Sequence, residues 1–150
     1  MITDLAKSQP FDTLLIQVKL PTARAILDLQ RNQPAQAVAA LEPARPYDLA
    51  ADRGSLGTFQ AIYVRGEAYL RSHDGANAAV EYQKIVDHRG IQPTSQFISL
   101  ARLGLGRAYA LQGDTAKAKS AYQDFFALWK DADPDVPLLT TAKAEYEKLK

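Results

Sequence analysis

The chain has 150 residues, of which 47% are hydrophobic and 23% charged, with 18 Lys and Arg against 17 Asp and Glu. These totals fit one folded domain with its own core and favour neither a disordered nor a fibrous protein, while a net charge of +1 without a basic stripe argues against a nucleic-acid partner. The chain has no cysteine, which excludes disulfides, thiolate nucleophiles and the usual structural zinc sites.

The first predicted unit is a helical hairpin over about residues 11–46. Its first helix contains Pro21, which lacks a backbone donor, so we expect a kinked or broken helix there. Turn-forming residues at 32–34 separate that helix from a second, Ala-rich helix over 35–42.

Two further hairpins follow, over about residues 58–89 and 97–130. Turn-forming residues that include Gly divide each of them into two helices, at 73–75 and at 112–114. Their apolar residues recur at three- and four-residue intervals, which is the helical period and not the strand period. The last segment, 137–150, is amphipathic and is predicted to form a helix that caps the exposed end.

The three units are copies of one repeat. Ala37, Ala78 and Ala118 occupy the same place in each and lie 41 and 40 residues apart. The second and third units share six residues at equal intervals: Gly66, Ala68, Tyr69, Ala78, Tyr82 and Gln83, then Gly106, Ala108, Tyr109, Ala118, Tyr122 and Gln123. Such regular spacing is typical of repeat proteins. The predicted fold is therefore all-α, an α-solenoid of about three helical hairpins with a C-terminal capping helix.

These units resemble the tetratricopeptide repeat, whose first helix carries Gly and Tyr three positions apart and whose second carries Ala and then an aromatic residue. The second unit matches this pattern with Gly66, Tyr69, Ala78 and Tyr82, and the third with Gly106, Tyr109, Ala118 and Tyr122. We expect Gly66 and Ala78 to lie where the two helices of a hairpin approach most closely, with the tyrosines filling the space around them.

The first unit departs from the family pattern. Ala25 and Asp28 stand where Gly and Tyr are usual, and in the third unit Arg102 stands where an apolar residue is common. The period also exceeds the usual length of about 34 residues, so the extra residues are expected in loops between the hairpins. The resemblance implies a non-catalytic scaffold or adaptor that binds other proteins.

A narrower resemblance covers most of the chain. Three stretches, 63–66, 81–90 and 129–135, are similar to the C-terminal repeat regions of acidobacterial multidomain proteins, typically serine/threonine kinases or winged-helix regulators. This resemblance implies the sensing or docking arm of a larger bacterial signalling protein. The chain itself shows neither a Gly-rich phosphate loop nor a kinase catalytic loop.

Asp131, Asp133 and Asp135 have the alternate spacing that begins a calcium-binding loop. Such a loop requires Gly at its sharp turn and a bidentate Glu near its end, but Val136 and Ala142 occupy those places. We therefore interpret the three aspartates as residues that end one helix and N-cap the last one.

The remaining polar residues form no recognisable catalytic or metal-binding pattern. His73 and His88 have no second ligand at a suitable spacing, and the chain lacks the Gly-x-Ser-x-Gly elbow of a hydrolase. Basic residues such as Arg65 alternate with Glu67 and Asp74, which we interpret as a solvated helical face. We expect no enzymatic activity, no catalytic residue, no metal and no cofactor.

The first helices of such hairpins line the concave surface of a solenoid, where partners bind. With Gly66 and Gly106 facing inward, that surface is predicted to carry Gln60, Tyr63, Glu67, Arg71, Leu103, Arg107 and Leu111. Apolar anchors among charges of both signs suit an extended peptide or a helix whose carboxylate pairs with an Arg. The alternative that these residues are merely exposed to solvent stays open.

The predicted partner is another protein or peptide, and the alternative function is self-association as a homodimer. No apolar run approaches the ~20 residues that a membrane span needs, and the N-terminus lacks the layout of a signal peptide. We therefore expect a soluble protein without membrane insertion, cytoplasmic by default, whether it stands alone or belongs to a longer chain.

Overall fold

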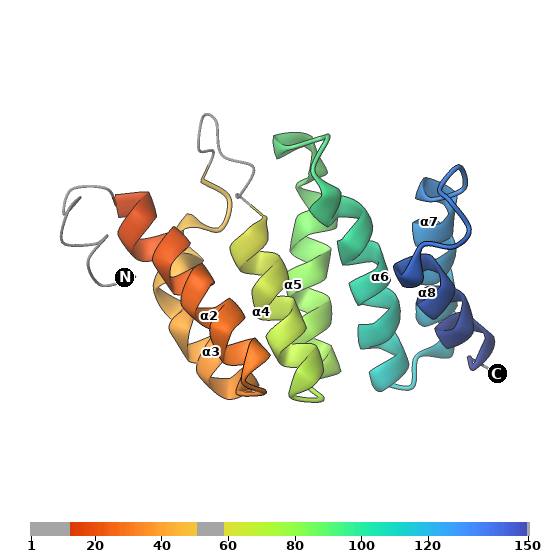
Figure 1. Cartoon of the computed structure of the whole chain (residues 1–150), viewed down its shortest axis with the longest axis horizontal. Coiled ribbons are helices and arrows are strands. Elements are labelled where there is room, and N and C mark those ends of the chain that lie inside the picture. The colour runs from red at the N-terminus through yellow and green to blue at the C-terminus, as the bar shows by residue number, and fades with distance from the viewer. Residues whose placement is uncertain (1–12, 51–58, 150) are drawn as a thin grey trace.

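The computed structural model of this protein describes residues 13–50 and 59–149. Every regular element within these two ranges is a helix, and neighbouring helices pack against one another, so the all-α prediction is confirmed. The helices form three hairpins and a last helix: α2 (Leu20–Gln30) with α3 (Pro34–Ala40), α4 (Gln60–Arg71) with α5 (Gly75–Asp87), α6 (Gln96–Leu111) with α7 (Thr115–Leu128), and α8 (Pro137–Glu147). Figure 1 shows the hairpins in chain order along the long axis, with α2 and α3 at one end and α7 and α8 at the other. The predicted boundaries at residues 11, 58 and 150 lie outside the described residues.

A π-helical turn, Leu15–Lys19, leads into α2 without a break. Pro21 lies in the first turn of α2, and in a regular α-helix its ring would clash with the carbonyl group four residues earlier. The wider π turn relieves that clash, and the Thr22 hydroxyl donates a hydrogen bond to the Val18 carbonyl at 2.7 Å. The expected disturbance at Pro21 is therefore a change of helix type within a continuous helix.

The three hairpins turn at the predicted places, and each turn has the same backbone shape. One residue in each turn adopts a left-handed conformation, with φ of 56° at Asn32, 57° at His73 and 75° at Gly113. Asn and Gly tolerate this conformation better than other residues do, so two of the three turns carry a suitable residue.

The second helix of the first hairpin is shorter than predicted. α3 ends at Ala40, because Pro43 cannot donate the hydrogen bond that another α-helical turn would need. A 3-10 helix, η2 (Glu42–Tyr47), continues the chain from there, and a second 3-10 helix, η3 (Arg89–Ile91), follows α5.

Two glycines hold the ring of Tyr82 between neighbouring hairpins. A Cβ atom at Gly66 of α4 would lie 2.7 Å from this ring, and one at Gly104 of α6 would lie 2.5 Å from it. Gly106 has the same relation to Tyr122, at 2.7 Å. The close approach predicted at Gly66 is confirmed, and the Tyr82 ring fills the space there as expected.

A buried charge cluster joins the first two hairpins. Arg65 is completely buried, and its guanidinium lies 2.6 Å from Asp48 and 3.0 Å from Glu81. Burial alone would lower the pKa of Arg65, but the hydrogen bonds and charges of Glu81 and Asp48 outweigh it and raise the pKa. Lys84 adds a second contact to Asp48 at 2.9 Å. The interpretation of Arg65 as part of a solvated face is therefore wrong.

Arg45 of η2 extends this cluster toward solvent. Its guanidinium lies 3.1 Å from Glu81 and donates to the Tyr69 hydroxyl at 3.0 Å. Both acceptors belong to the second hairpin, so residues of the first connector hold the two hairpins together.

Candidate functional site

The first helices of the hairpins lie next to one another. α2 packs against α4 and α4 against α6, and α8 continues the row because Leu139 and Ala142 pack into one core cluster with Leu103 of α6. We call the surface that α4, α6 and α8 share the inner face, and its polar residues are Tyr63, Glu67, Arg107, Glu145 and, directly after α8, Lys148.

Leu103 does not belong to an accessible surface. It is only 1% exposed, beneath α8 and against Tyr122 and Phe125. The prediction that Leu103 contacts a partner is therefore wrong, because the capping helix covers the part of α6 that sequence periodicity left open.

Glu67 is the centre of one polar group on the inner face. The Tyr82 hydroxyl donates to its carboxylate at 2.6 Å, and the charge of the same carboxylate acts on the nearby phenol of Tyr63. Burial and the charge of Glu67 raise the pKa of both phenols, so both stay protonated, and Tyr82 donates to Glu67. The Tyr63 ring packs 5.2 Å from Phe97 and 5.7 Å from Tyr82, between ring centroids, so Tyr63 supports the core as well as the surface.

Glu145 of α8 is the centre of a second group. Arg107 donates to both of its carboxylate oxygens, at 2.9 and 3.1 Å, and the Tyr122 hydroxyl donates to it at 2.9 Å. Burial would lower the pKa of Arg107, but Glu145 and the nearby charge of Glu67 outweigh it and raise the pKa. Arg107 therefore lies between two carboxylates, and α8 supplies its main partner.

A cleft of about 440 Å³ opens beside this ion pair. Its walls are Leu70, Arg107, Ala110, Leu111, Tyr122, Glu145, Lys148 and Leu149. Leu111 is 46% exposed here, which is high for a large aliphatic side chain. No hydrogen bond or ion pair holds the Lys148 side chain within the described part of the chain. The cleft thus offers an apolar anchor point next to an available cation.

The other predicted contact residues lie outside the cleft. Gln60 is exposed at the start of α4, and Arg71 donates to the Leu29 carbonyl at 2.7 Å, at the end of α2. The structure therefore brings Tyr63, Glu67 and Arg107 together and adds Leu111, but it does not gather the predicted residues into one contact surface.

Sequence reasoning missed Glu145, Lys148 and Leu149, which come from the capping helix. The amphipathic pattern of 137–150 predicted a helix, but it carried no signal for the side of α6 on which that helix packs. The spacing of Gly106 and Tyr122 was the one available signal. It predicts that the Tyr122 ring packs at the end of the molecule, where its hydroxyl needs a hydrogen-bond acceptor from a following segment.

The aspartates before α8 do not cap it. The N-cap residue is Val136, which makes no side-chain hydrogen bond, so the predicted N-capping by an aspartate is wrong. Asp133 instead accepts a hydrogen bond from the Asp135 amide at 3.1 Å, and Asp131 is exposed. Among the described residues, no three His, Asp or Glu side chains gather as metal ligands would. None of the described helices is long and apolar enough to span a membrane.

Comparisons with protein-family models, with curated proteins and with solved structures found no match for this chain. No relative therefore lends it a function. The resemblance to the tetratricopeptide family rests on the repeat residues themselves, and among these the glycines that contact Tyr82 and Tyr122 have a clear packing role.

Proposed function

We propose that this protein is a non-catalytic protein-binding module, a solenoid of three tetratricopeptide-type hairpins closed by a capping helix. Three hairpins in a row, each turning within three residues, support this architecture. The small residues of the repeat lie against the large ones, as close helix packing requires. The bacterial resemblance favours a docking or sensing arm of a larger signalling protein.

The observation that carries this proposal is the cleft between α6 and α8. It combines the exposed side chain of Leu111 with apolar walls at Leu70 and Leu149, and the Arg107–Glu145 ion pair forms one side. A concave apolar site with a few fixed polar groups is typical of peptide recognition. Since most of its walls come from the first helices α4 and α6 and from the end of α8, with Tyr122 of α7 behind them, the site has the position in which solenoids hold their partners.

The charged residues of the cleft indicate what kind of peptide would bind there. Arg107 is already paired with Glu145, so it is not the cation that a ligand carboxylate meets first. Lys148 is exposed at the edge of the cleft and has no ion-pair partner among the described residues. We expect a short peptide or helix with an aliphatic or aromatic anchor and an acidic residue close to it.

A peptide-display selection against the immobilised chain tests this function. We expect selected peptides to share an apolar residue next to an acidic one, and Leu111→Glu with Lys148→Glu to weaken their binding at least about tenfold, as measured by calorimetry. Leu128→Glu is the matched control, since Leu128 is 55% exposed on α7, slightly more than Leu111, but lies outside the cleft. Peptides that bind the double variant as well as the wild type would remove the cleft as the site, and a selection that yields no binder would contradict the function itself.

A further inference from the structure

Two residues of α2, Arg24 and Asp28, are equivalent by repeat position to residues that form a contact between hairpins. Arg24 and Asp28 occupy the places in the first hairpin that Arg65 and Tyr69 occupy in the second, 41 residues later. In the second hairpin both of those residues contact the preceding unit. Arg65 is bonded to Asp48, and the Tyr69 hydroxyl accepts from Arg45 of η2.

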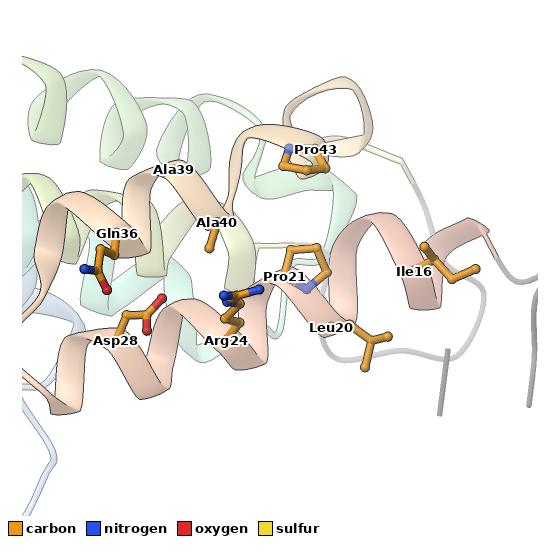
Figure 2. Close-up of a pocket in the computed structure, with 9 residues that line it drawn as sticks. All are labelled: Ile16, Leu20, Pro21, Arg24, Asp28, Gln36, Ala39, Ala40 and Pro43. Atoms are coloured by element: carbon orange, nitrogen blue, oxygen red, sulfur yellow. The ribbon is translucent and has the colours of Figure 1, made fainter. Parts of the chain in front are cut away.

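Arg24 and Asp28 have no such contact. They line a cavity of about 630 Å³ on the end surface formed by α2 and α3, and the other residues that line it are Ile16, Leu20, Pro21, Gln36, Ala39, Ala40 and Pro43. Figure 2 shows Asp28 extending from α2 toward α3 within this cavity. We call this surface the end face. No hairpin covers it among the described residues, as Figure 1 shows for α2 and α3.

The state of the Asp28 side chain is a second observation, independent of the repeat register, that indicates a binding partner at the end face. The residue is only 6% exposed, yet no hydrogen bond or ion pair reaches its carboxylate from the described residues. Its oxygens are not among the fully enclosed atoms that lack a partner, so the carboxylate keeps contact with water only through the cavity, from which a cation can reach it. Arg24 is exposed one helical turn away and does not form an ion pair with Asp28. The end face therefore has an unpaired anion and an unpaired cation beside apolar walls.

We propose that the end face is a self-complementary docking surface on which a second copy of this chain binds around a two-fold axis. The axis crosses the end face at a level midway between the two charged residues along α2, so that Arg24 of each copy reaches Asp28 of the other. The two residues are about 6 Å apart along the helix, which places both ion pairs within one crossing of antiparallel α2 helices at the usual interaxial distance of about 8–10 Å.

The charge pattern selects a second copy over a different partner. A two-fold interface requires that a surface match itself, with residue i contacting j and j contacting i. Arg24 and Asp28 meet that requirement, since one α2 helix supplies both the cation and the anion of the pair. The apolar residues Leu20, Ala39 and Ala40 lie beside the charged pair, and the same symmetry brings them together from the two copies. This dimer does not use the cleft near α8, so it is independent of the proposed peptide binding.

Solution mass is the first measurement. Sedimentation equilibrium of the full chain, from about 1 to about 300 μM, should show conversion from 16.5 kDa to twice that mass. Arg24→Glu should remain monomeric over this range, because it places two anions opposite two anions. Arg24 is exposed, so this variant should fold, which its circular dichroism would verify. Lys143→Glu is the matched control at the far end of the molecule and should dimerise as the wild type does.

Variants that reverse the charges at positions 24 and 28 give the decisive test of the interface. Asp28→Arg alone should also be monomeric, since each copy then presents two cations. An equimolar mixture of Arg24→Glu and Asp28→Arg should form a heterodimer at least about tenfold more tightly than either variant pairs with itself. If Asp28→Arg fails to fold, the double variant Arg24→Asp with Asp28→Lys, which restores both signs in one chain, takes its place and should dimerise.

Three results would overturn the proposal. The first is a wild-type chain that stays monomeric at the highest concentration, which would assign the end face to a different partner. The second is an Arg24→Glu variant that dimerises as tightly as the wild type, which would place the dimer interface elsewhere. The third is a mixture of folded variants that shows no gain over each variant alone.

Discussion

The first and second hairpins each pack against the hairpin that follows, but they use different residues at the contact. In the second hairpin the aromatic Tyr82 lies between Gly66 of its own first helix and Gly104 of the next hairpin, with no room for a Cβ atom on either side. Large and small residues alternate across the contact, which is how helix surfaces interlock at close distance.

The first hairpin has Leu41 in the place of Tyr82, and its neighbours are larger. Ala25 stands where the second hairpin has Gly66, and Val64 stands where the next unit has Gly104. Ala25, Leu41 and Val64 are all buried in one core cluster. A smaller residue on the second helix thus accompanies larger ones on both first helices. What the repeat preserves is the total volume at the contact and not the identity of each residue.

The largest expected effect comes from a charge that only one of the two hairpins buries. Arg65→Leu should lower the free energy of unfolding by about 3–5 kcal/mol, because it leaves Asp48 and Glu81 buried without their main partner. Arg24→Leu changes the equivalent position of the first hairpin, which is exposed, and should change the free energy by less than about 0.5 kcal/mol. Urea unfolding at a concentration where the chain is monomeric measures both.

A double variant shows whether the cluster or the arginine itself matters. The third hairpin has the apolar pair Leu105 and Ala121 at the places of Arg65 and Glu81, and both are buried. Arg65→Leu with Glu81→Ala should therefore be more stable than Arg65→Leu alone, since it removes the carboxylate that the single variant leaves unpaired. A double variant less stable than the single one would mean that Glu81 acts mainly through Arg45 or Lys84.

The next effect tests volume matching. Gly104→Val introduces the residue that the preceding unit has at this place, and it should lower the free energy of unfolding by about 1–3 kcal/mol. The reason is that its Cβ would lie 2.5 Å from the ring of Tyr82, which is completely buried and has no space to move. Gly90→Ala is the control, because nothing lies within 4 Å of a Cβ atom there. Its effect on the unfolding midpoint should be small.

A triple variant that gives the second hairpin all three contact residues of the first tests volume matching more directly. Gly66→Ala, Tyr82→Leu and Gly104→Val together give the second hairpin the residues of the first, and this triple variant should be more stable than Gly104→Val alone. Part of the loss should remain, because the hydrogen bond from Tyr82 to Glu67 is gone. If the triple variant is the least stable of all, residue identity and not summed volume governs this contact.

The sequence was sufficient for the features that depend on local pattern. Turn-forming residues located the three turns, and the spacing of Gly66, Tyr82, Gly106 and Tyr122 located the close contacts between helices. These features depend on which residues a short segment contains and on the helical period, and a single chain displays both.

Features that depend on how distant segments meet could not be predicted. The carboxylates around Arg65 come from positions 17 and 16 residues away, one of them in a connector without an assigned role. The burial of Leu103 and the pairing of Arg107 both depend on the docking angle of α8, which its amphipathic pattern does not specify. The candidate site was therefore predicted as a row of first-helix residues, whereas three residues that line the cleft, Glu145, Lys148 and Leu149, come from α8 and the residues directly after it.

The smallest effect concerns the caps of the second helices. Asp74 and Asp114 accept hydrogen bonds from the amides of Asn77 and Lys117, each at 3.0 Å, whereas Gln33 at the same place in the first hairpin makes no such bond. Gln33→Asp should therefore stabilise the protein by about 1 kcal/mol at pH 7, measured by urea unfolding. An unchanged midpoint would mean that the first hairpin cannot use a cap.

The same caps set a pH dependence with a definite sign. The hydrogen bonds from the side chain and the backbone amide of Asn77 hold the pKa of Asp74 below its ordinary value of 3.8. A carboxylate with a lowered pKa in the folded state adds stability above the unfolded pKa, and that stability is lost as the pH falls through the folded pKa. Asp74→Asn keeps a capping side chain without a titrating group, so it should match the wild type near pH 7 and lose less stability between about pH 4 and pH 2. Equal losses in both proteins over that range would show that other carboxylates, such as those around Arg65, control unfolding in acid.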